Sequence, residues 1–214
     1  MSQGLRERKK QQTRELIAET ARRLFGQRGF EAVTVAEIAR AADVSQATVF
    51  NYFPTKEDLF YSGLEAFEDE MLAAVRERAS GESVLAAFRA FLLGQRGVFD
   101  LPEEAEATER LRTVTRVVTQ SPALLARERR VFADYARSLA ALIADESGSD
   151  PRDVEPRAAA DALLAVHRAL IEFVRERTLA GAPAGEIARA TRSQGKRAFA
   201  RLEHGFGDYA VKRQ

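Results

Sequence analysis

The sequence predicts an all-α protein, and two observations support this fold class. Apolar residues recur at the three- and four-residue spacing of amphipathic helices, and no strand-like alternation bounded by hairpin turns is present. Glycine, serine and proline divide the chain into about nine helices. The last six helices are expected at 56–79, 83–97, 102–119, 122–146, 156–180 and 184–204.

Two short helices and a tight turn are predicted within residues 34–56, TVAEIARAADVSQATVFNYFPTK. Thr34 and Glu37 have the spacing of a capping box at the start of the first helix, and Ser45 is the N-cap expected for the second. Pro54 ends the second helix, because the residue before a proline is disfavoured in the helical region, and Thr55 caps a third. This arrangement predicts a helix-turn-helix, which places its second helix in the major groove of DNA.

Composition and charge narrow the class of protein. The 214 residues are 45% hydrophobic and 30% charged, as in a globular protein with a full core, and the absence of cysteine excludes disulfides and thiolate chemistry. With neither a signal-peptide core nor an apolar run long enough to cross a bilayer, we expect a cytoplasmic protein with no membrane partner. Basic side chains outnumber acidic ones in residues 1–56, which favours contact with a polyanion.

An enzyme built on a helical bundle is the opposing class, and the sequence argues against it. It lacks paired histidine metal motifs, a glycine-rich phosphate loop and a nucleophile elbow. Its two histidines, His167 and His204, fall on separate predicted helices, and its densest acidic cluster, 103–109, lies at a helix start. We therefore expect no catalytic residues, no metal site and no cofactor.

The helix-turn-helix belongs to a longer pattern. Residues 16–30, LIAETARRLFGQRGF, precede it, and YFPTKEDL follows at 52–59. Over residues 11–65 the chain resembles the TetR family of transcriptional regulators. The resemblance implies a three-helix DNA-binding domain with a basic N-terminal arm at 1–55 and a helical ligand-binding and dimerisation domain at 56–214. It further implies a homodimeric repressor that binds a palindromic operator and is released by a small-molecule effector. The alternative is a helical ligand-binding or adaptor protein without DNA activity.

The second helix of the turn supplies the residues expected to contact DNA. Gln46 and Asn51 suit paired hydrogen bonds to adenine, and the Thr48 methyl group suits a thymine methyl. The resemblance adds Ala47 at the groove floor and Phe50, which stands where a tyrosine commonly donates to phosphate and lacks that hydroxyl. Side chains and helix-start amides at four further positions are expected to hold phosphates. Those positions are Thr34, Ser45, Tyr52 and Lys56.

The predicted helix at 156–180 is apolar around most of its girth, which indicates two packing partners. Burial within one subunit is one reading; the resemblance implies instead a dimer formed by the last two helices. It also implies an effector pocket, which a continuous helix at 56–79 would couple to the DNA-binding helices. The candidate lining residues, each of which could equally be plain core, are Phe88, Phe91, Leu92, Val114, Val117, Val118, Phe132, Tyr135 and His167.

Overall fold

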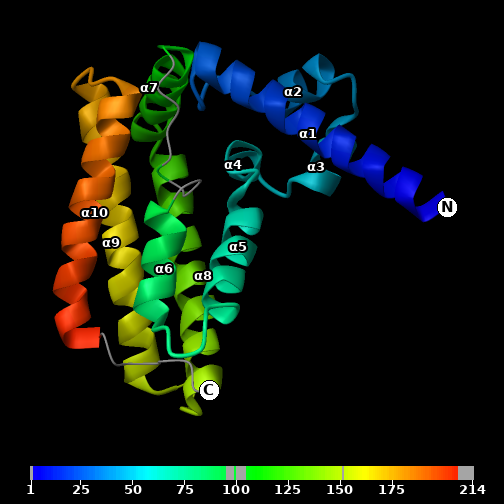
Figure 1. Ribbon diagram of the computed structural model, residues 1–214. Coiled ribbons are helices and arrows are strands. Elements are labelled where there is room, and N and C mark those ends of the chain that lie inside the picture. Colours follow the sequence, from blue (N-terminus) through cyan, green and yellow to red (C-terminus); the bar gives the residue numbers. More distant parts are fainter. Residues whose placement is uncertain (1, 95–98, 100–104, 151, 207–214) are drawn as a thin grey trace. The chain divides into compact units, whose positions relative to one another are not determined.

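The computed structural model describes residues 2–94, 99, 105–150 and 152–206 (Figure 1). These residues form ten α-helices and no strand, so the predicted all-α fold is confirmed. The helices are α1 (Ser2–Arg28), α2 (Val35–Ala41), α3 (Gln46–Tyr52), α4 (Lys56–Phe60), α5 (Leu64–Arg76), α6 (Val84–Leu93), α7 (Ala105–Thr119), α8 (Pro122–Ser147), α9 (Val154–Leu179) and α10 (Ala184–Phe206).

The chain divides into two compact units that do not follow one cut in the sequence. The first unit contains the described residues of Met1–Glu65 together with Arg116–Glu128, and the second contains those of Ala66–Thr115 and Arg129–Gln214. The end of α7 and the start of α8 therefore belong to the first unit. The functional boundary expected after residue 55 stays a prediction.

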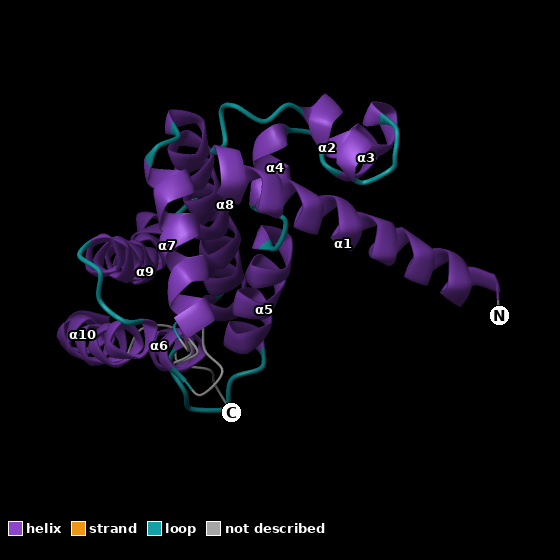
Figure 2. Ribbon diagram, turned by 90° about the horizontal axis from the view of Figure 1, so that it is seen from above, coloured by secondary structure: helices purple, strands orange, loops and turns teal. Residues whose placement is uncertain are grey.

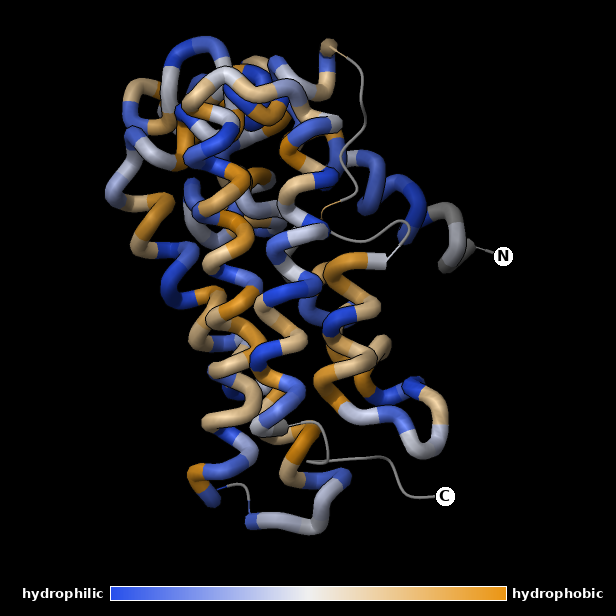
Figure 3. Tube along the Cα trace, turned by 60° about the vertical axis from the view of Figure 1, so that its left-hand side comes forward, coloured by the Kyte–Doolittle hydropathy of each residue, from blue (hydrophilic) through white to orange (hydrophobic). Residues whose placement is uncertain are grey.

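The first unit has its own hydrophobic core. α1 packs against α2 and α4, and α2 packs against α3 (Figures 1 and 2). Val117, Val118 and Leu124 from the ends of α7 and α8 complete this core, in which they are almost fully buried. The N-terminal part of α1 is mostly hydrophilic (Figure 3), and the basic segment expected as an arm is part of a helix.

The prediction of a single helix at 56–79 is wrong, because the structure divides this segment into α4 and α5 at residues 61–63. Gly63 lies in the break, where its low helix propensity favours an interruption. Tyr61 also leaves the helical path, and its hydroxyl lies 3.3 Å from the Leu124 carbonyl oxygen of α8. This break accounts for the tenth helix. The predicted ends at 95–97 and 102–104 lie outside the described residues.

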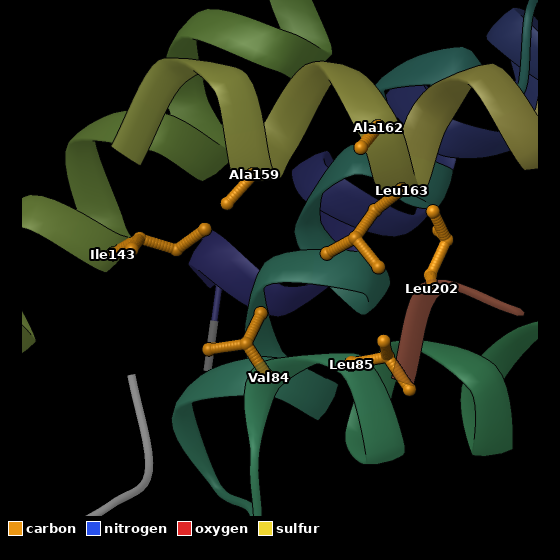
Figure 4. A pocket seen from close by; sticks show the side chains of 7 residues that line it. All are labelled: Val84, Leu85, Ile143, Ala159, Ala162, Leu163 and Leu202. Atoms are coloured by element: carbon orange, nitrogen blue, oxygen red, sulfur yellow. The ribbon is translucent and has the colours of Figure 1, made fainter. Parts of the chain in front are cut away.

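In the second unit, α10 packs against α9 and α6 (Figures 1 and 2). Gly195 of α10 allows a close approach to α6, because a Cβ there would stand 2.7 Å from a methyl carbon of Leu93. Aliphatic side chains of α6, α8, α9 and α10 enclose a cavity of about 10 Å³, with Ala162 on its wall (Figure 4). A cavity of this size holds no more than a water molecule.

Helix α9 buries one face and leaves alanines on the other. Its buried side chains include Leu163, Leu164 and Leu170. Ala158, Ala165 and Ala169 are exposed, at spacings that place them on one side of a helix. We call these three residues the alanine face.

Candidate functional site

The first helix of the turn is fixed by a complete capping box, as the sequence predicts. The Thr34 side chain accepts from the Glu37 amide at 3.2 Å, and the Glu37 carboxylate accepts from the Thr34 amide at 2.8 Å. Arg28 also donates to Glu37, at 2.8 Å. The Thr34 backbone hydrogen bond, followed by that of Arg28, lowers the pKa of Glu37 to about 2. Thr34 is exposed and already bonded within the cap.

A left-handed residue makes the turn between α2 and α3. Asp43 has a φ of 53°, a conformation that aspartate tolerates better than most residues. The Val44 amide donates back to the Ala39 carbonyl oxygen at 2.9 Å and closes the turn. Ser45 then caps α3 by accepting from the Thr48 amide at 3.0 Å.

Helix α3 is anchored on one side and free on the other. Val49 and the C-cap residue Phe53 are buried in the core of the first unit. The opposite side carries polar and apolar groups that water can reach, including Phe50, which is 48% exposed although it is a large apolar residue. The exposed residues of α3 are Gln46, Ala47, Phe50 and Asn51.

Two of the predicted DNA contacts in α3 are partly covered. Thr48 is half-buried, and its hydroxyl lies 2.8 Å from that of Ser45. Tyr52 is half-buried and packs against the core of the first unit. Both remain predictions as DNA contacts, and the structure brings them together with the exposed residues of α3.

Lys56 has contacts within the first unit that the sequence did not reveal. Its ammonium donates to the carbonyl oxygens of Phe30 at 2.9 Å and Val33 at 3.2 Å. It also lies 4.1 Å from the centroid of the Phe30 ring, a cation–π distance. Lys56 thus ties the start of α4 to the segment between α1 and α2.

Lys56→Met is expected to destabilise the first unit by about 2 kcal/mol, because it leaves two carbonyl oxygens without their charged donor. Chemical unfolding followed by circular dichroism measures the change. Lys9→Met is the matched control for stability alone, since Lys9 is exposed on α1. If Lys56 also holds a phosphate, the same variant reduces the slope of log DNA affinity against log salt concentration by about one. Unchanged stability would contradict the structural role.

An open groove lies beside α3 in the first unit. It has a volume of about 970 Å³ and is lined by residues of α1 and by Tyr52. Its basic members are Arg6, Lys9 and Lys10. Positive side chains along a groove suit a phosphate backbone.

The second unit gathers aromatic rings around His167 of α9. The ring centroid of His167 lies 5.1 Å from that of Phe132, 5.2 Å from that of Phe67 and 5.9 Å from that of Phe99. Phe67 also contacts Phe91 and Tyr135, at 5.4 and 5.3 Å. We call these six residues the His167 cluster. Burial lowers the pKa of His167 to about 3, so the imidazole is neutral at pH 7.

The other residues considered for an effector pocket do not belong to the His167 cluster. Phe88 pairs with Phe199 of α10 and is fully buried, as is Leu92. Val114 is 47% exposed. Val117 and Val118 pack in the core of the first unit, whereas the His167 cluster belongs to the second. Phe67 and Phe99 were not among the predicted site residues, and Phe99 had no helical periodicity that could have identified it.

The described part of the chain has few features that would support another functional class. Its residues include no group of three or more acidic, histidine or cysteine side chains that could hold a metal ion. None of its helices is long and apolar enough to cross a membrane. Its fold and its exposed α3 define instead a DNA-binding protein of the helix-turn-helix class.

Comparison with known proteins identifies the family. Residues 17–62 match the profile of bacterial regulatory proteins of the tetR family, and residues 82–193 match that of the MftR C-terminal domain. TcmR of Streptomyces glaucescens, a transcriptional regulator, is 35% identical over 159 residues, which are 72% of this chain and 69% of TcmR. MftR of Mycobacterium tuberculosis, named for regulation of mycofactocin biosynthesis, is 30% identical over 74% of this chain and 78% of its own. The chain belongs to the TetR family of transcriptional regulators.

Solved structures agree on the fold. NalD of Pseudomonas aeruginosa, a secondary repressor of a multidrug efflux pump, aligns with a TM-score of 0.56 at 19% identity, over 88% of this chain and 97% of its own. GusR of Salmonella enterica aligns with a TM-score of 0.53 at 21% identity, over 90% and 94% of the two chains. The chain is a DNA-binding regulator and not an enzyme.

Proposed function

We propose that this regulator is a cytoplasmic homodimeric repressor that binds a palindromic operator and is released by a small-molecule effector. The observation that supports it most is the exposed side of α3. A helix held rigidly by Val49 and Phe53 presents Gln46, Ala47 and Asn51 outward, as insertion into the major groove requires.

Phe50 adds an apolar group to that surface. It follows Gln46 by one helical turn, so the two side chains share a face of α3. An exposed phenyl ring cannot donate to phosphate, but it can contact the methyl group of thymine. We therefore assign Phe50 to base contact instead of the phosphate contact that a tyrosine would make.

The alanine face of α9 supports a homodimer. Ala158, Ala165 and Ala169 leave room for another helix to approach closely. The family resemblance also assigns α10, the last helix, to the interface. Its exposed side carries two charged residues, Lys196 and Arg197. A symmetric dimer presents two copies of α3 to half-sites one helical turn of DNA apart, or a multiple of it, which suits a palindromic operator.

Helix α8 supports coupling between an effector and DNA. Near its start, Arg127 pairs with Asp58 of α4 at 3.0 Å, within the first unit. One to two turns later, Phe132 and Tyr135 belong to the His167 cluster of the second unit. Because α4 and α5 are separate helices, we assign the transmission to continuous α8 and not to the helix expected at 56–79. Linkage then requires operator and effector to weaken each other's binding by the same factor.

Gln46→Ala is expected to cost about 1–3 kcal/mol of affinity for the preferred operator and to relax sequence preference at one base position. The reason is the loss of a paired hydrogen bond to a base edge from an exposed residue of α3. A binding-site selection experiment, performed with the purified full-length protein, measures both effects.

The control is Gln27→Ala, which removes an exposed glutamine of α1 outside the turn. It should leave the selected sequence unchanged. If Gln46→Ala selects the same operator as the unmodified protein, Gln46 does not read bases. If the unmodified protein selects no sequence at all, the operator-binding function is wrong.

A further inference from the structure

The Nδ1 atom of His167 is buried and has no hydrogen-bond partner. The residue is only 3% exposed, and aromatic rings from α5 and α8 pack around it. A buried polar atom without a partner is costly, because folding removes its hydrogen bonds to water and supplies none in return. A phenylalanine at this position would avoid that cost, so the histidine calls for a functional explanation.

The rings of the His167 cluster differ in how much water can reach them. Phe132 and Tyr135 are buried, whereas Phe67 and Phe91 are only half-buried. These two half-buried rings contact each other at 5.4 Å and are tilted by 54°. Tilted and edge-on ring contacts are the geometry in which aromatic groups attract one another, and a flat aromatic ligand can take the place of one ring in such a set.

We propose that the His167 cluster binds the effector, and that the effector is an uncharged aromatic molecule whose hydroxyl group bonds to Nδ1 of His167. The identification of this ligand as an effector rests on the proposed function; its binding to the protein does not. The site opens on ligand entry by displacement of the half-buried rings Phe67 and Phe91.

The chemistry of the imidazole selects the hydroxyl group. A neutral histidine has one nitrogen that donates and one that accepts, and a hydroxyl can bond to Nδ1 in either tautomer because it does both. A carboxylate ligand would instead be stripped of water among aromatic rings, and none of the ring contacts of His167 within the described residues brings a cation. The site therefore favours a phenol over an aromatic acid.

Titration of the full-length protein with 2-naphthol, naphthalene and 2-naphthoate tests this proposal. We expect saturable binding of 2-naphthol, about tenfold tighter than that of naphthalene, which lacks the hydroxyl. The anion 2-naphthoate should show no saturable binding. Nitrogen NMR of the imidazoles localises the bond: the Nδ1 resonance of His167 should shift, while that of His204, which is exposed, should not.

Two variants complete the test. His167→Phe keeps an aromatic ring but removes Nδ1, so 2-naphthol should lose its preference over naphthalene; His204→Phe, the matched control, should retain it. Equal binding of 2-naphthol and naphthalene by the unmodified protein would overturn the proposal. So would an unmoved His167 resonance, a preference that survives in His167→Phe, or saturable binding of 2-naphthoate. The resonance shift needs no variant and decides the matter if His167→Phe does not fold.

Operator binding, measured in parallel without ligand, separates this inference from the proposed function. Operator binding with no response of His167 to 2-naphthol would refute the ligand site alone. A His167 response with no operator binding would refute the repressor alone.

Discussion

The Ala169→Glu variant is expected to sediment as a folded monomer, whereas the unmodified protein is expected to sediment as a dimer. Ala169 is exposed on α9, at the alanine face that we assign to the dimer interface. In a symmetric dimer the substitution buries an unpaired carboxylate from each subunit, a cost on the order of 3–5 kcal/mol. Ala162 suits the experiment less well, because it lines a small cavity within the second unit.

Sedimentation and circular dichroism together decide this prediction. Ala141→Glu places the same charge at an exposed site of α8 and should leave the dimer intact. A dimeric Ala169→Glu protein would rule out an interface at the alanine face. Loss of helical signal together with loss of the dimer would indicate that α9 packs within its own subunit at this position.

Acidification is expected to destabilise the protein through His167. Burial lowers the pKa of this residue from 6.5 to about 3. Between these pH values the imidazole is protonated in the unfolded chain and neutral in the folded protein. The free energy of unfolding therefore falls as the pH falls below 6.5, by about 1.4 kcal/mol per pH unit, and it is unaffected by this group above 6.5. At pH 5 the loss is about 2 kcal/mol relative to pH 7.

The comparison of variants isolates this contribution from that of the carboxylates. His167→Phe should have a weaker pH dependence between pH 7 and pH 5, whereas His204→Gln, at an exposed position, should follow the unmodified protein. Urea unfolding followed by circular dichroism provides the measurement, since the chain has no tryptophan to report by fluorescence. Parallel pH profiles for all three proteins would show that His167 is not held neutral by burial.

Local signals in the sequence were sufficient for the helix-turn-helix. Thr34, Ser45 and Thr55 are followed by short-range partners, so each cap is decided by residues three positions away. The all-α class and most helix boundaries likewise depend on periodicity and punctuation within a few turns. The resemblance to the TetR family over residues 11–65 pointed to the same family that the comparisons identify.

Contacts between distant segments could not be predicted in this way. The break at residues 61–63 involves a bond from Tyr61 to Leu124, and the position of Lys56 depends on carbonyl oxygens of Phe30 and Val33. The His167 cluster joins Phe67 to a histidine one hundred positions later. None of these partners is marked by spacing in the sequence, because tertiary packing selects them.

Residues 116–128 have a consequence for any attempt to cut or recombine this chain. An N-terminal fragment that stops at residue 65 lacks Val117, Val118 and Leu124, and apolar surfaces of Ile17, Phe25 and their neighbours would lose part of their cover. A hybrid regulator that joins this DNA-binding segment to a foreign ligand-binding segment would meet the same gap. Such a graft must transplant two separate stretches of sequence, so a single crossover cannot exchange the DNA-binding unit.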